Sequence, residues 1–112
     1  MTHTIPPAEA LSLDALIAPT AQGIASRILA RTTGGNLTLF AFDRGQGLAE
    51  HTSPFDVMVM VLEGSIDLTI GGAPVRATPM TIVRMPAGVP HGLEAPEACR
   101  MLLIMLRDNT AA

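Results

Sequence analysis

Residues 80–95 of this 112-residue chain read MTIVRMPAGVPHGLEA. Thr81–Met85 and His91–Ala95 carry the β-branched and apolar residues of short strands, whereas the Pro-Ala-Gly run at 86–88 is typical of a turn. The stretch therefore predicts two strands joined by a short connection, with a histidine at the start of the second strand.

Short runs of β-branched and apolar residues, separated by turn residues, continue on both sides of this stretch, from Ile24 to Arg107. Six further predicted strands are Ile24–Arg31, Asn36–Phe42, Val57–Glu63, Ser65–Ile70, Val75–Ala77 and Cys99–Arg107. Short strands at this spacing, without helical periodicity, favour one all-β domain built as a double-sheet barrel. We assign residues 1–23 to an N-terminal arm outside the barrel, 24–107 to the barrel and 108–112 to a frayed tail.

The composition of the chain indicates which partners it is suited to bind and in which cellular compartment we expect it. The chain has 7 Lys and Arg against 10 Asp and Glu, a net charge of −3, so it carries no basic patch for nucleic acid or a membrane surface. Because it also lacks a long apolar run and a basic, apolar leader, we expect a cytoplasmic protein with no membrane partner. The single cysteine, Cys99, is either a small core or interface residue or a reactive thiol.

Two predicted strands are apolar on both faces. In Val57–Leu62 and in Met101–Leu106 every position is Val, Leu, Ile or Met, so neither pleat face is suited to water. One face can fill the barrel, whereas the other needs the arm or a second copy of the chain. We predict a homodimer through these outer faces, with coverage by the arm alone as the alternative.

The stretch from Gly45 to Gly64 reads GQGLAEHTSPFDVMVMVLEG, and together with residues 80–95 it resembles the two sequence motifs of the cupin superfamily. The first motif runs from a glycine through His-x-His and Glu to a glycine, and the second from a glycine through Pro-x-Gly and His to Asn. Six residues match: Gly45, His51, Gly64, Pro86, Gly88 and His91. The resemblance covers residues 36–107 and implies a single-domain, RmlC-like cupin jelly-roll β-barrel of the cupin 2 type, a double-stranded β-helix.

Four positions depart from the motifs: Ser53 replaces the second histidine, Val57 the glutamate, Met80 a glycine and Ala95 the asparagine. Family metal sites use three histidines and one glutamate, so the resemblance implies a centre reduced to His51 and His91. Two neutral imidazoles do not offset the charge of a buried divalent ion. We expect no tightly bound metal, with Zn, Ni, Fe or Cu completed by water or substrate as the alternative.

His51, Ser53 and Val57 have the same parity, so on a single pleated strand they would share a face. The resemblance places His91 on a strand opposite. Alternatively, Pro54 introduces a bulge that turns Asp56 inward instead of Val57. The predicted ligand pocket consists of His51, Ser53, Val57, Val59, Met60 and His91.

Three functions are compatible with this pocket. The first is binding of a small, largely apolar molecule, with His51 and His91 as its polar handle. The second is a reduced-ligand metalloenzyme, a dioxygenase or isomerase, or a metal-free enzyme in which a histidine acts as general base. The third is a structural dimer module with a vestigial pocket. Loss of the family's ligands favours the first, and the sequence assigns neither a reaction nor a ligand.

Overall fold

The computed structural model describes residues 4–107, and the tail predicted at 108–112 lies outside that range. Its elements are α1 Leu13–Leu16, β1 Ile24–Thr32, β2 Gly35–Phe42, β3 Gly47–His51, β4 Asp56–Glu63, β5 Ile66–Ile70, β6 Ala73–Ala77, β7 Ile82–Met85, β8 His91–Glu94 and β9 Cys99–Leu106. No helix within residues 4–107 is long and apolar enough to cross a membrane.

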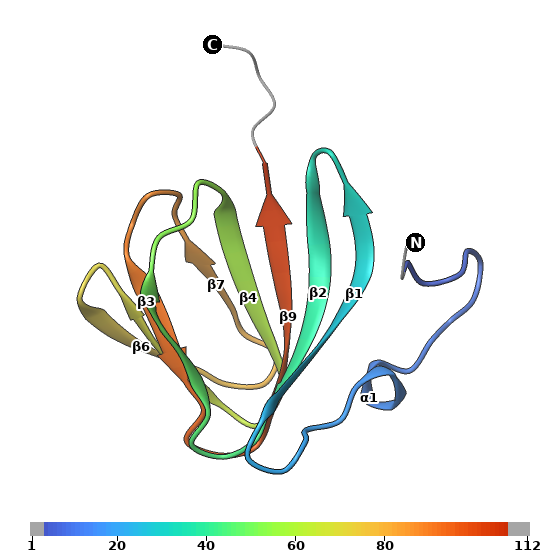
Figure 1. Cartoon of the computed structure of the whole chain (residues 1–112), viewed down its shortest axis with the longest axis horizontal. Coiled ribbons are helices and arrows are strands. Elements are labelled where there is room, and N and C mark those ends of the chain that lie inside the picture. The colour runs from blue at the N-terminus through green and yellow to red at the C-terminus, as the bar shows by residue number, and fades with distance from the viewer. Residues whose placement is uncertain (1–3, 108–112) are drawn as a thin grey trace.

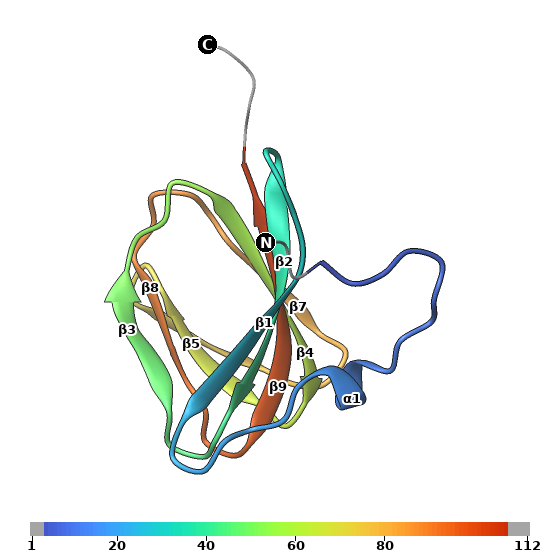
Figure 2. The ribbon, with the colours of Figure 1, turned by 45° about the vertical axis from the view of Figure 1, so that its right-hand side comes forward.

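The strands form two antiparallel sheets that face each other (Figures 1 and 2). One sheet has the order β1-β2-β9-β4-β7, and the other has the order β3-β8-β5-β6. From β2 onward the chain passes repeatedly between the two sheets, as in a jelly roll. The all-β, double-sheet fold predicted from the sequence is therefore confirmed.

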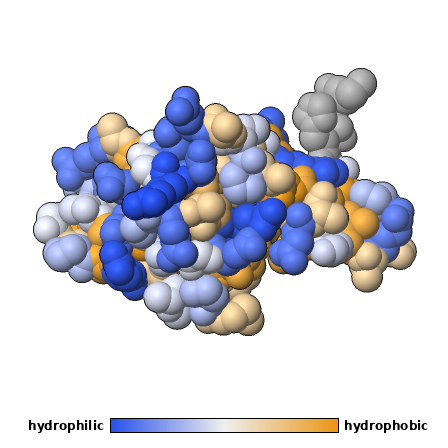
Figure 3. Space-filling model, turned by 90° about the horizontal axis from the view of Figure 1, so that it is seen from below, coloured by the Kyte–Doolittle hydropathy of each residue, from blue (hydrophilic) through white to orange (hydrophobic). Residues whose placement is uncertain are grey.

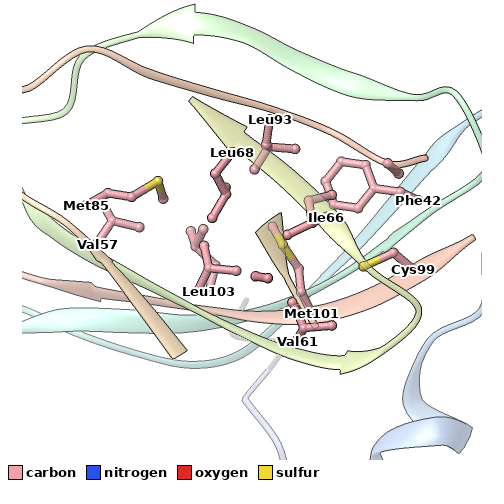
Figure 4. Packing of buried hydrophobic residues seen from close by; sticks show 13 residues of the cluster. Phe42, Val57, Val61, Ile66, Leu68, Met85, Leu93, Cys99, Met101 and Leu103 are labelled. Atoms are coloured by element: carbon pink, nitrogen blue, oxygen red, sulfur yellow. The ribbon is translucent and has the colours of Figure 1, made fainter. Parts of the chain in front are cut away.

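The core lies between the two sheets, where Val57, Leu68, Met85, Leu93 and Leu103 point toward one another (Figure 4). Alternation along β4 explains the two-faced apolar sequence, because Val57, Val59 and Val61 are buried while Met58, Met60 and Leu62 are half-buried on the opposite face. The interior of the barrel is thus packed with side chains, so open space is expected only toward its ends.

The N-terminal arm packs on the outside of the five-stranded sheet. Ile17 and Leu16 of the arm pack with Leu39 and Ala41 of β2 in a second apolar cluster. The backbone N–H of Ile5 donates to the Leu29 carbonyl at 2.9 Å, which fixes the arm along β1. Seen from below, apolar and polar residues are interspersed over the surface of the molecule (Figure 3).

Strand β3 was not among the predicted strands. Four of its five residues are exposed, so it lacks the apolar alternation from which a strand is predicted. The expectation that His51, Ser53 and Val57 share one strand is wrong, because β3 ends at His51 and β4 begins at Asp56 in the other sheet. Pro54 has no N–H for a ladder, and the Ser53 hydroxyl instead accepts a hydrogen bond from the Phe55 N–H at 3.1 Å.

Candidate functional site

His51 and His91 lie side by side in the four-stranded sheet. They are direct cross-strand partners, His51 as the last residue of β3 and His91 as the first residue of β8. Their ring centroids are 4.5 Å apart and the ring planes meet at 65°, an edge-on contact. The two histidines retained from the motifs therefore form one polar pair, contributed by neighbouring strands of the same sheet.

A β-bulge in β3 turns His51 toward the same face as His91. Leu48 pairs with Leu93 and His51 with His91, so Ala49 and Glu50 together lie opposite Gly92. Without the extra residue, His51 would face away from the side that Leu48 occupies. Glycine at position 92 makes room for the bulge, since a Cβ there would lie 3.2 Å from the Glu50 nitrogen.

Each histidine ring is held by a backbone carbonyl two residues earlier in the chain. Nδ1 of His51 lies 2.8 Å from the Ala49 oxygen, and Nδ1 of His91 lies 3.1 Å from the Val89 oxygen. A carbonyl oxygen only accepts, so in the neutral ring the proton sits on Nδ1. Nε2 of each ring then carries a lone pair, which can accept a hydrogen bond or bind a metal.

His91 is buried, at 4% exposure, whereas His51 is exposed, so the pair lies at the boundary between the interior and solvent. Three hydrogen bonds brace the loops beside it. The Gly88 N–H donates to the Ser53 carbonyl at 2.9 Å, the Ala87 N–H to the Asp56 carboxylate at 2.9 Å, and the Gly71 N–H to the Pro90 carbonyl at 2.8 Å. These contacts preorganise the rim on which the histidines sit.

The remaining predicted pocket residues differ in their surroundings. Ser53 is a buried loop residue, and Val57 and Val59 belong to the packed core. Met60 lies on the outer face of β4, because the strand alternates and the valines occupy the inner face. We therefore omit Met60 from the site.

Val57, and not Asp56, occupies the interior. Asp56 bonds outward to the Arg84 guanidinium at 3.0 Å, and its carboxylate also accepts the Ala87 N–H. The Ala87 N–H, and after it the Arg84 side chain, hold the pKa of Asp56 below its ordinary value. The alternative in which a bulge at Pro54 turns Asp56 inward is therefore wrong.

The described residues do not fit the four-ligand metal centre of the cupin motifs. Within residues 4–107, no three His, Cys, Asp or Glu side chains are grouped so that they could hold a metal ion. At the glutamate position, Val57 is 2% exposed among aliphatic side chains. The pair offers two neutral nitrogen donors with no carboxylate, a weak set for a divalent ion.

A cavity of about 560 Å³ was not predicted from the sequence. Its lining includes Arg31, Asn36, Phe55, Met105 and Arg107, and neither histidine. These residues come from well-separated segments and follow no spacing, so only the folded chain brings them together.

Comparison with known proteins identifies relatives of the whole chain. The family model described as "Cupin domain" matches residues 38–105. A conserved protein of unknown function from Streptococcus pyogenes is 33% identical, with 98% of each chain covered and a TM-score of 0.89. A cupin 2 conserved barrel domain protein from Leptotrichia buccalis is 28% identical over 87% of this chain and 47% of its own, with a TM-score of 0.83.

A cupin superfamily protein from Desulfitobacterium hafniense shares the fold, with 24% identity, coverage of 96% of this chain and 97% of its own, and a TM-score of 0.86. The chain matches no curated protein.

Proposed function

The chain belongs to the cupin family, and on that premise we propose that it binds a small, largely apolar molecule at the mouth of the barrel, with His51 and His91 as the polar handle. The observation that carries the proposal is the edge-on histidine pair, in which both Nδ1 atoms are occupied by backbone carbonyls. The Nε2 lone pairs that this arrangement leaves suit a ligand that presents a hydroxyl or N–H donor.

The surroundings of the pair favour an apolar ligand body. Leu93 follows His91 on the same face of β8, and Leu48 precedes His51 on the same face of β3. Leu93 belongs to the main core cluster, and Leu48 packs against it. A ligand body placed beside them would gain about 25 cal/mol for each Å² of apolar surface it buries. Because the described residues do not fit the metal centre, direct ligand binding is preferred to a metalloenzyme.

Phenol is a suitable probe, since it combines an aromatic body with one hydroxyl donor, and toluene is its matched apolar control. We expect phenol, and not toluene, to shift the NMR signals of the two imidazole rings in a saturable way. The His51→Ala/His91→Ala double variant should bind phenol roughly tenfold more weakly, the effect expected for one or two lost hydrogen bonds.

Thr52→Ala serves as the matched control, because Thr52 is an exposed polar residue directly after His51 and outside the pair. It should bind phenol as the parent does. Equal phenol affinity in the parent and in the double-histidine variant would contradict the proposed role of the pair.

We also propose that the outer face of the five-stranded sheet forms a homodimer. The arm covers the β1–β2 side of this face, whereas Met58 and Met60 of β4 remain half-buried and Ile82 of β7 is 57% exposed. Met60 and Ile82 are cross-strand partners, so they form one continuous apolar strip. An Ile82→Glu variant should convert a dimer to a monomer in sedimentation velocity. A parent that sediments as a monomer would contradict this assignment.

A further inference from the structure

The cavity of about 560 Å³ opens on the inner face of the five-stranded sheet. Its placement follows from the strand register: Arg31 pairs with Asn36, Asn36 with Met105, and Met105 with Val57. Direct cross-strand partners share a face of a sheet, and Val57 belongs to the core. Arg31, Asn36 and Met105 therefore line the inside of the barrel near the end of β9 and the β1–β2 hairpin, which lie at the top of Figure 1.

Two guanidinium groups face this cavity without a carboxylate partner. Arg76, Arg84 and Arg100 each form a salt bridge, with Asp67, Asp56 and Glu63 respectively. Within residues 4–107 neither Arg31 nor Arg107 pairs with a carboxylate, and the cavity lining contains no Asp or Glu. In a chain of net charge −3, such a concave positive site favours an anion.

One carboxylate, that of Asp56, lines a second cavity together with Arg107. Its two oxygens are already used, one by Arg84 at 3.0 Å and the other by the Ala87 N–H at 2.9 Å. Asp56 therefore leaves the charge of Arg107 available to a ligand.

The positions of Arg107 and Asn36 are fixed by neighbouring groups. The Cζ atom of Arg107 lies 4.9 Å from the centroid of the Phe55 ring, a cation–π contact that leaves the N–H edge of the guanidinium for a planar anion. Asn36 donates from Nδ2 to the Met105 sulfur at 3.6 Å, a weak acceptor that an oxygen ligand would displace. The cavity thus presents guanidinium and amide donors beside Phe55 and Met105.

We infer that Arg31 and Arg107 bind the carboxylate of a small organic acid whose apolar body lies against Phe55 and Met105. Guanidinium groups match a carboxylate through paired N–H···O bonds, and the apolar wall distinguishes an organic acid from an inorganic anion. The inference rests on the proposed function in one respect, since it assigns the acid group to the molecule bound at the barrel mouth.

The test uses benzoate as the probe in an NMR titration of the full chain at constant ionic strength, with benzamide as its neutral isostere. Benzoate should shift the amide signals of Asn36, Phe55 and Arg107, and it should bind at least tenfold more tightly than benzamide. The Arg31→Gln/Arg107→Gln double variant should lose at least tenfold in benzoate affinity. Arg44→Gln, the control for each single arginine variant, removes one positive charge from an exposed turn outside the cavity and should bind as the parent does.

Three results would overturn the inference: benzoate that binds no better than benzamide, equal affinity in the double-arginine variant, or competition by inorganic phosphate as strong as by a second organic acid. Both arginines are exposed, so the glutamine variants should keep the parent melting temperature, and the two single variants provide the same comparison.

Titrating His51→Ala/His91→Ala with phenol and with benzoate separates the two proposals. If the arginines are needed for benzoate while the histidines are not needed for phenol, the carboxylate site stands and the proposed function falls. The reverse pattern removes the carboxylate site and leaves the histidine handle.

Discussion

His51 and His91 face each other across β3 and β8 with their ring centroids 4.5 Å apart, and both rings use Nδ1 to reach a backbone carbonyl. We expect both neutral rings to be the Nδ1–H tautomer, because the carbonyls of Ala49 and Val89 can only accept. Long-range ¹⁵N–¹H correlation spectra at about pH 8, where an ordinary histidine is neutral, will report the tautomer directly. An Nε2–H signal from either ring would contradict the geometry from which the ligand handle is inferred.

Asp56 gives the fold a defined sensitivity to acid. Its pKa is lowered from 3.8, first by the Ala87 N–H and then by Arg84, so its carboxylate stabilises the folded state. Because the folded-state pKa is the lower one, this contribution is complete above the ordinary value and disappears as pH falls through the lowered value. The melting temperature of the parent should therefore fall more steeply than that of Asp56→Asn below about pH 4.

Asp14→Asn is the control for this effect, since Asp14 lies on the exposed helix α1. It should follow the pH dependence of the parent. If the melting temperature of Asp56→Asn falls with acid as steeply as that of the parent, the contacts of Asp56 to Ala87 and Arg84 do not contribute to stability.

Cys99 should behave as a buried core residue. It is 1% exposed, and burial, followed by the charges of Glu97 and Glu63, raises the pKa of its thiol to about 11. The thiolate is the reactive form, so at about pH 8 the folded protein should react with Ellman's reagent only as it unfolds. Addition of denaturant should release one reactive thiol per chain. Rapid reaction of the native protein would instead favour the alternative of a reactive cysteine.

Gly64, the closing glycine of the first cupin motif, is required by its surroundings. Its φ is +74°, and a Cβ at this position would lie 2.1 Å from the Ala98 carbonyl oxygen. Gly72 has a φ of +84° with nothing within 4 Å of such a Cβ. Both alanine variants incur the cost of a left-handed conformation, about 1–2 kcal/mol. Gly64→Ala should lose a further ~2 kcal/mol or more of unfolding free energy in chemical denaturation. Equal losses would show that the β4–β5 turn shifts easily.

Much of the fold could be predicted because apolar alternation and turn residues report on burial. Val57, Val59 and Val61 fill the interior while Met58 and Met60 face outward, as a two-faced apolar strand requires. Strand β3 was not predicted because its side chains are mostly exposed. It is held by hydrogen bonds to β8, and such pairing leaves no pattern of apolar residues in the sequence.

The candidate site could be predicted only in part. The motif resemblance identified His51 and His91. That their side chains lie on the same face of the sheet depends on a bulge opposite Gly92, which no residue pattern predicts. Asp56 pairs with Arg84, which lies 28 positions away in the sequence, so the pairing leaves no local pattern. The shared parity of His51 and Val57 predicted one strand for both, but the chain changes sheets between them. The arginine cavity is assembled from distant segments, so it became visible only in the folded chain.

The central claim is that the histidine pair serves a bound molecule rather than a resident metal. Elemental analysis by inductively coupled plasma mass spectrometry tests it most directly, on untagged protein purified without chelator beside the His51→Ala/His91→Ala variant. We predict far less than one equivalent of Zn, Ni, Cu or Fe in the parent and no difference between the two proteins. Near-stoichiometric metal in the parent that is lost in the variant would contradict the account and make the protein a metal-binding cupin with a reduced ligand set.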